Sequence, residues 1–124
     1  MDPPVIFVVD DDESVRNAIR RLLHSLHFQV HTFASAEQFL AVTKTGAPGC
    51  LILDQRLPGM NAVQLQEHLC SLQWKLPTII ITAHDEDALR DQSLRLGAIA
   101  YLQKPFDNKV LLASVQQALG DDGI

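Results

Sequence analysis

The stretch Cys50-Leu51-Ile52-Leu53-Asp54 consists of four apolar residues closed by one carboxylate. Polar and turn-forming residues follow it, namely Gln55, Arg56 and Pro58-Gly59. A short apolar run bounded in this way is typical of a strand that is buried on both faces of a parallel sheet. Because the reactive crevice of an open α/β sheet lies beyond the carboxyl ends of its strands, Asp54 stands where chemistry is expected.

Two further apolar runs also end in polar residues. Residues 5–9 lead into Asp10-Asp11-Asp12, and residues 78–81 lead into Thr82. The carboxyl ends of parallel strands share one edge of the sheet, so these side chains are expected near Asp54. We predict a single acidic pocket that requires a cation, with Asp54 as the acceptor of a phosphoryl group.

Apolar strands alternate with amphipathic helices along the whole chain. Strands are expected at residues 5–9, 28–33, 50–54, 78–81 and 99–102, each followed by a helix. This alternation predicts an α/β fold, a doubly wound, five-stranded parallel sheet covered by five helices.

Helical periodicity indicates which residues each helix should bury. The apolar stripe of the first helix ends at Leu26, the second helix should bury Val42, and the third should bury Leu72. The second helix opens with a capping-box pattern, Ser35-Ala36-Glu37-Gln38, which predicts reciprocal side-chain bonds to the backbone. Two further N-caps are expected, at Asn61 and Asp107.

Composition suits one globular domain, since 47% of the 124 residues are hydrophobic and 20% are charged. We expect residues 1–120 to form this domain and residues 121–124 to form a tail or the start of a linker. A net charge of −5 with ten Lys and Arg residues argues against direct nucleic-acid contact by this domain, because such contact needs clustered cations. No apolar run approaches the ~18 residues of a membrane span, and no signal peptide is evident. We therefore expect a cytoplasmic protein without a membrane role, in which Cys50 and Cys70 are inert core thiols.

Carboxylates gathered at one edge repel one another, so they must protonate, stay solvated or bind a cation. Ligands that are all oxygen select a hard ion, and a site left partly open to water and phosphate suits Mg²⁺. Lys104, which follows the last predicted strand, would add fixed positive charge, and Thr82 would add a hydroxyl. These are the groups that phosphoryl transfer requires, with Asp54 as the nucleophile.

Five segments in order carry a resemblance to a known family: VDDDESVR at 9–16, SAEQFL at 35–40, LDQRLPGM at 53–60, IITAH at 80–84 and GAIAYLQKPF at 97–106. The sequence resembles the receiver domains of two-component response regulators, most closely the nitrogen-fixation (FixJ-like) regulator subgroup. The resemblance implies a flavodoxin-like receiver fold with strand order 2-1-3-4-5. It covers nearly the whole chain.

The resemblance also assigns roles around the acidic pocket. It implies that Asp54 is the phosphorylation site and that Asp10 and Asp11 hold Mg²⁺, together with Asp54 and the backbone carbonyl of Arg56. By the same comparison Asp12 falls outside the metal pair and is expected to cap the first helix.

Further positions match the family's switch. Thr82 and Lys104 would contact the phosphoryl group, and the Lys104-Pro105 bond would be cis. Tyr101 matches an aromatic position whose ring moves with the hydroxyl residue and remodels the face formed by the fourth helix, fifth strand and fifth helix. Ala62 departs from the family, which commonly has glycine there, so the loop after Asp54 would be less free to adopt a positive φ.

The resemblance implies a signalling module rather than an enzyme. A sensor histidine kinase would supply the phosphoryl group, and the remodelled face would control dimerisation or an output domain. In this subgroup that output is usually a helix-turn-helix DNA-binding domain, which this chain does not contain.

Two other interpretations stay open at this point. A haloacid-dehalogenase-like phosphatase would use Asp10 as its nucleophile, because Asp10-Asp11-Asp12-Glu13-Ser14 fits that family's pattern, but it would leave Asp54 without a role and place its later acidic pair at Asp121-Asp122. An interaction module could also keep the fold without being phosphorylated. Intact mass after incubation with a phosphodonor separates these possibilities.

Overall fold

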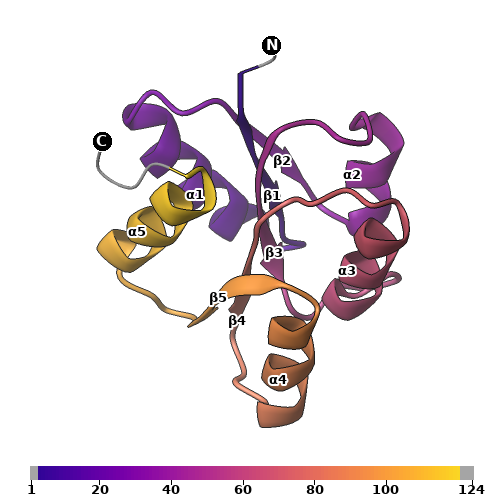
Figure 1. The fold of residues 1–124 in the computed structure, drawn as a ribbon. Helices are drawn as coiled ribbons and strands as arrows, with labels where there is room; N and C mark the ends of the chain where they lie inside the picture. Colours follow the sequence, from indigo (N-terminus) through magenta and orange to yellow (C-terminus); the bar gives the residue numbers. More distant parts are fainter. Residues whose placement is uncertain (1–2, 121–124) are drawn as a thin grey trace.

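A five-stranded parallel sheet forms the centre of the chain in this computed structural model, which describes residues 3–120 (Figure 1). The strands are β1 Val5–Val9, β2 Val30–Phe33, β3 Gly49–Asp54, β4 Thr78–Thr82 and β5 Ala98–Gln103. Their order is β2-β1-β3-β4-β5, and every neighbouring pair is parallel. The predicted fold class and strand order are confirmed. The predicted tail at 121–124, with Asp121-Asp122 of the phosphatase interpretation, lies outside the described residues, and the domain division stays a prediction.

Helices cover both faces of this sheet. They are α1 Glu13–Ser25, α2 Ala36–Val42, α3 Ala62–Ser71, α4 Asp87–Arg95 and α5 Asn108–Ala118. Figure 1 shows α1 and α5 together on one side, α2 and α3 on the other, and α4 next to β5. None of the helices in the described part of the chain has the length and apolarity of a membrane span.

The central strand is buried on both faces, as its unbroken apolar run predicts. Leu51 and Leu53 belong to the core between the sheet and helices α2 and α3. Cys50 and Ile52 belong to the opposite core, which packs against α1 and α5. Successive side chains of a strand point to opposite faces, so two separate cores require apolar residues at every position of β3.

The helix starts follow the predicted capping chemistry. The side chains of Asp12, Asn61 and Asp107 accept backbone N–H bonds at the first turns of α1, α3 and α5. At α2, Ser35 Oγ accepts from the Gln38 N–H at 3.1 Å, but Gln38 Oε1 accepts from the N–H of Ala34 rather than that of Ser35. The predicted capping box is therefore only half formed at α2.

The predicted burial of three residues at the ends of helices is wrong. Leu26 and Leu72 follow the last residues of α1 and α3 as C-caps and are 43% and 40% exposed. Val42 is the last residue of the short helix α2 and is 74% exposed. Leu26 and Leu72 continue the periodic pattern of the sequence after the helix itself has ended, so they lose their place on the buried face, whereas Val42 is still helical and lies on the exposed side of α2.

The prediction for the cysteines is half right, and the one for Ala62 does not apply as stated. Cys50 is buried, but Cys70 is exposed, because it lies next to Leu69 on the helix and about 100° around it. Ala62 is the first residue of α3 and is fully buried without a positive φ. Gly59 has the positive φ of this loop, at 74°.

Candidate functional site

Three carboxylates meet at the carboxyl edge of the sheet. Asp10 and Asp11 follow β1, Asp54 ends β3, and one oxygen from each lies within 4.8 Å of the others. Asp10 is fully buried and Asp54 is 6% exposed, whereas Asp11 is exposed. The carboxylates predicted to meet at this edge do lie together, because the adjacent parallel strands β1 and β3 end side by side.

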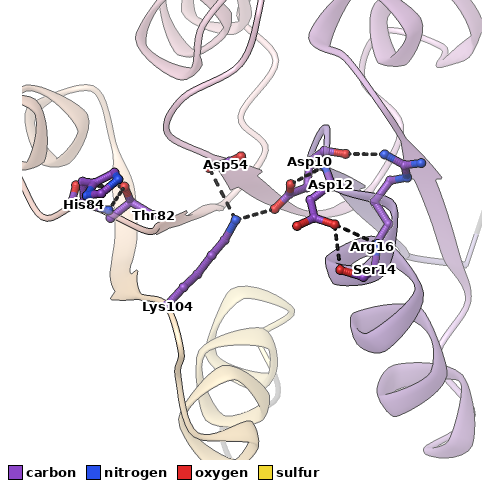
Figure 2. Close-up of polar contacts among 8 residues, drawn as sticks. All are labelled: Asp10, Asp12, Ser14, Arg16, Asp54, Thr82, His84 and Lys104. Atoms are coloured by element: carbon purple, nitrogen blue, oxygen red, sulfur yellow. Dashed lines mark hydrogen bonds and ion pairs between the residues drawn. The ribbon is translucent and has the colours of Figure 1, made fainter.

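Lys104 brings a positive charge into the same cluster. Its Nζ lies 2.8 Å from Asp10 Oδ2 and 3.7 Å from Asp54 Oδ1, as Figure 2 shows. Its backbone N–H donates to the carbonyl of Thr82 at 2.7 Å, and the following peptide bond to Pro105 is cis, as expected. The end of β5 is therefore tied to the end of β4, and the lysine side chain reaches across β4 to the acidic residues.

Asp10 is held in place on both sides. Its Oδ1 accepts the backbone N–H of Asp12 at 2.9 Å, and its carbonyl oxygen accepts from Arg16 Nη1 at 2.7 Å (Figure 2). The sequence pattern alone assigns no role to Arg16. Its position one turn into α1 lets the guanidinium reach back to the loop, a contact that periodicity does not reveal.

Burial raises the pKa of Asp54 to about 7, and the neighbouring carboxylate of Asp10 adds to this rise. The Lys104 ammonium and the N–H of Arg56 act in the opposite direction. Without a further cation, Asp54 is therefore partly protonated near neutral pH. This acidic cluster is suited to a divalent ion, which favours the ionised form of every carboxylate near it.

Asp12 has a different role from its two neighbours. It accepts from the N–H and the hydroxyl of Ser14 at 2.9 and 2.7 Å, and these bonds lower the pKa of the Asp12 carboxyl. It is exposed and is not part of the three-carboxylate cluster. The structure thus places Asp12 as the expected helix cap.

Thr82 lies at the same edge but its hydroxyl is turned away from Asp54. Its Oγ1 donates to the carbonyl of His84 at 2.9 Å and accepts the His84 N–H at 3.1 Å (Figure 2). This local turn satisfies the buried hydroxyl inside the loop after β4. A contact between Thr82 and a group on Asp54 would require these two bonds to break.

Tyr101 packs half-buried against the core shared with α2 and α3. Its hydroxyl oxygen is buried and has no hydrogen-bond partner among the described residues. Burial raises the pKa of Tyr101, and the nearby Asp85 carboxylate adds to the rise. A buried hydroxyl without a hydrogen-bond partner costs free energy, so a movement of the ring that supplies a partner would be favourable.

Two contacts shape the loop after β3. Arg56 forms an ion pair with Glu86, which is the N-cap residue of α4, and a cleft of about 510 Å³ opens between this loop, Asp11 and the start of α4. On the other side, Glu37 Oε2 accepts the N–H of Met60 at 2.9 Å. Neither contact is predictable from the sequence pattern, because each joins segments that are distant in the chain.

Comparison with known proteins gives consistent matches over most of the chain. Residues 6–116 match the family model described as response regulator receiver domain. The transcriptional regulatory protein TdiR of Thauera aromatica is 40% identical over 114 residues, which are 92% of this chain and 50% of that protein. FixJ of Bradyrhizobium diazoefficiens is 33% identical over 114 residues, 92% of this chain and 56% of that protein. The chain thus spans about half the length of these curated relatives.

Solved structures agree with these sequence matches. The response regulator StyR has a TM-score of 0.91 and 41% identity, covering 98% of this chain and 61% of that chain. The structure described as FixJ-N has a TM-score of 0.87 and 32% identity, covering 97% of this chain and 96% of that chain.

Proposed function

This chain belongs to the response regulator receiver domain family, and from this we propose that Asp54 is the residue through which it receives its signal. The expected family is confirmed, and FixJ proteins are among the matches. Members of this family act in two-component signalling by phosphorylation, and the relatives found are transcriptional response regulators, signalling modules rather than enzymes. One observation carries the proposal for Asp54: it ends β3 beside two other carboxylates and within 3.7 Å of the Lys104 ammonium.

The proposed reaction is transfer of a phosphoryl group from the phosphohistidine of a sensor histidine kinase. A carboxylate oxygen of Asp54 attacks the phosphorus, an O–P bond forms and the N–P bond of the donor breaks. The imidazole leaves with the bonding electron pair and takes up a proton from solvent. Asp54 must be ionised to attack, and burial raises its pKa. Nearby positive charge therefore supports the reaction by favouring the ionised carboxylate.

Mg²⁺ fits the residues present. Receiver domains generally bind this ion at an acidic pocket, and here Asp10, Asp11 and Asp54 would hold it with the carbonyl of Arg56. When bound, the ion offsets negative charge on the carboxylates and on the phosphoryl oxygens. Lys104 adds charge that is already in place, since its Nζ is shared between Asp10 and Asp54.

Thr82 and Tyr101 are the residues proposed to respond. The Thr82 hydroxyl would leave the backbone of His84 and donate to a phosphoryl oxygen on Asp54. Tyr101 lies on the neighbouring strand β5, where it pairs with Ile80, two residues before Thr82. Its hydroxyl has no hydrogen-bond partner among the described residues and gains one if the ring changes position. Tyr101 belongs to β5, and the face formed by α4, β5 and α5 carries Leu94 and Val110, which are 43% and 47% exposed. We propose this face as the surface that controls dimerisation or an output domain.

The partners follow from the same proposal. A sensor histidine kinase supplies the phosphoryl group, and the relatives' additional length would hold the output domain, which we propose to be of the helix-turn-helix type. A cytoplasmic location and the absence of direct nucleic-acid contact by this domain stay predictions.

The phosphatase interpretation is disfavoured, since Asp10 is fully buried and already bonded to Lys104 and to the N–H of Asp12.

The test is the intact mass of the chain after incubation with acetyl phosphate, with and without Mg²⁺. One phosphoryl group should be added to the wild type in the presence of Mg²⁺ and none to Asp54→Asn. Asp11→Asn and Asp12→Asn form a matched pair, because they are adjacent exposed carboxylates and only Asp11 belongs to the cluster. Asp11→Asn should lose most of the labelling, and Asp12→Asn should keep it.

Other outcomes would refute the assignment. An adduct that persists in Asp54→Asn but disappears in Asp10→Asn would favour the phosphatase-like nucleophile. A wild type that takes no phosphoryl group and binds no beryllofluoride would favour an interaction module without phosphorylation.

A further inference from the structure

Three buried polar side chains join the strand that ends in Asp54 to helices α3 and α4. Gln55 directly follows Asp54, Gln66 lies in α3 and Ser93 lies in α4, and their exposed fractions are 3%, 3% and 0%. The Ser93 hydroxyl donates to Gln55 Oε1 at 3.2 Å, and Gln66 Nε2 donates to the Ser93 carbonyl at 3.0 Å. We call these three residues the α4 latch. They are far apart in the sequence, and the site described above uses none of them.

The Gln66 bond satisfies a carbonyl at the end of a helix. Ser93 is among the last four residues of α4, whose carbonyls lack the usual intrahelical N–H partner. The N–H of Gly97, four residues on, donates to the carbonyl of Leu94 instead, at 3.0 Å. Gln66 therefore caps the carboxyl end of α4 from a different helix.

The latch is also the buried attachment of α4. Within the described residues, Ser93 is the buried residue of this helix, and the N-cap residue Glu86 makes no side-chain capping bond. Leu94, the next residue, is 43% exposed. Helix α4 is consequently fixed to the core by directional hydrogen bonds more than by apolar contact, and such bonds weaken steeply when the partners shift.

The position of the latch connects it to the phosphorylation site. Gln55 follows Asp54 directly, so a displacement of this strand end would also displace the oxygen that accepts the bond from the Ser93 hydroxyl. Gln66 Oε1 is buried and has no hydrogen-bond partner within residues 3–120, so the latched arrangement leaves one polar atom unsatisfied. If α4 moves and water reaches this oxygen, the oxygen gains a hydrogen bond, which lowers the free-energy cost of the movement.

We propose that Gln55, Ser93 and Gln66 are positioning residues that hold α4 in its phosphoryl-free arrangement and couple that arrangement to the state of Asp54. This inference rests on the proposed function of Asp54. A contact made only in the phosphoryl-free arrangement raises the free-energy cost of leaving it. Removal of the latch should therefore make the chain bind a phosphoryl analogue more tightly, by linkage.

Ser93→Ala is the direct test, and Ser114→Ala is its matched control. Ser114 is also a buried helical serine, 8% exposed, but its hydroxyl donates to the Val110 carbonyl of its own helix at 3.0 Å. Two quantities are measured for each variant: hydrogen–deuterium exchange of residues 87–95 without phosphoryl analogue, and the Kd for beryllofluoride with Mg²⁺. Ser93→Ala should accelerate exchange in α4 and lower the Kd by about 5-fold or more, the lower end of typical coupling, whereas Ser114→Ala should change neither.

Gln66→Leu is the second variant, because it keeps most of the buried volume and removes the bond to the Ser93 carbonyl, together with the unsatisfied Gln66 Oε1. It should show the same two changes, and circular dichroism verifies that each variant is folded. Faster exchange with an unchanged Kd would mean that the latch is merely structural, and equal effects in Ser93→Ala and Ser114→Ala would mean general loosening; either result overturns the proposal. If the wild type itself binds no beryllofluoride, the proposed function of Asp54 has failed and the switch role of the latch fails with it.

Discussion

Helices α4 and α5 lie on either side of the last strand, yet they are held to the molecule by different forces. Helix α5 buries Leu111 and Val115 fully and is capped at its start by the Asp107 side chain. Helix α4 buries Ser93 and starts at Glu86, which makes no side-chain capping bond. Apolar burial fixes one helix, and hydrogen bonds to neighbouring elements fix the other.

The difference has a physical consequence for movement. Apolar attraction has no direction and is proportional to the area removed from water, so a helix held by it stays docked through small displacements. Hydrogen bonds demand narrow distances and angles, so a helix held by them has a few discrete positions. An element with little apolar burial also belongs to the part of a protein that opens most easily. We therefore expect α4 to respond to events at Asp54 while α5 stays fixed.

The largest expected effect on the free energy of unfolding comes from a substitution in α5, the helix held by apolar burial. Leu111→Ala removes a fully buried side chain of α5 and should lower the free energy of unfolding by about 2–5 kcal/mol, from lost transfer energy plus a cavity. Leu94→Ala, in α4, removes a side chain that is 43% exposed and should cost less than about 1 kcal/mol. Urea unfolding of both variants measures the two values. Equal losses would show that α4 contributes as much apolar packing as α5.

The ionisation of Asp54, which directly precedes Gln55 of the α4 latch, should make the stability of the chain depend on pH. The pKa of Asp54 is raised to about 7 from an ordinary value of 3.8, so between these pH values the folded chain keeps a proton that the unfolded chain has released. Stability without metal should therefore fall as pH rises from about 4 to about 7. Asp54→Asn removes this loss and should be more stable than the wild type at pH 8 by on the order of 1–3 kcal/mol.

The measurement is urea unfolding at pH 5 and pH 8 in the presence of a chelator. Addition of Mg²⁺ should stabilise the wild type at pH 8 and stabilise Asp54→Asn much less. A stability gap between the two proteins that is the same at both pH values would contradict the raised pKa of Asp54.

The sequence predicted the acidic cluster well because topology alone determines it. Once residues 5–9 and 50–54 are parallel neighbours, Asp10, Asp11 and Asp54 have to end at one edge. The same argument does not reach the side-chain rotamer of Thr82, which depends on the turn made by His84. The sequence pattern thus predicts where a strand ends, whereas the direction of the Thr82 hydroxyl depends on the conformation of the folded loop.

The α4 latch was not predictable for a different reason. The pattern places Gln55 at the start of a turn after a strand, and polar residues such as Gln66 and Ser93 fall among residues that normally face solvent. Their burial depends on three segments meeting in space, and a single sequence without pairing information does not show which polar residues will satisfy one another. Buried polar bonds are thus the part of this fold that periodicity misses.

A smaller effect compares how the two helices begin. Asp107→Ala removes the side chain that accepts the Lys109 N–H at 2.7 Å and should destabilise the chain by about 1 kcal/mol. Glu86→Ala removes no capping bond at α4, although it loses the exposed ion pair with Arg56, and should cost less than about 0.5 kcal/mol. Thermal unfolding at matched pH gives both values. A larger loss for Glu86→Ala would mean that the start of α4 is held more firmly than its contacts indicate.

The smallest expected effect lies on β5, between the two helices. The Tyr101 hydroxyl is buried and has no hydrogen-bond partner in the described part of the chain, so Tyr101→Phe removes no hydrogen bond seen there and eliminates the desolvation cost of a polar group. The phosphoryl-free chain should be unchanged or more stable by up to about 1 kcal/mol, in contrast to most substitutions. Thr82→Val is the matched control, because it removes a buried hydroxyl that makes two bonds to His84 and should cost about 1–2 kcal/mol. If Tyr101→Phe instead destabilises as much as Thr82→Val in urea unfolding, the tyrosine hydroxyl has a partner in solution and the α4 side of β5 is already locked before phosphorylation.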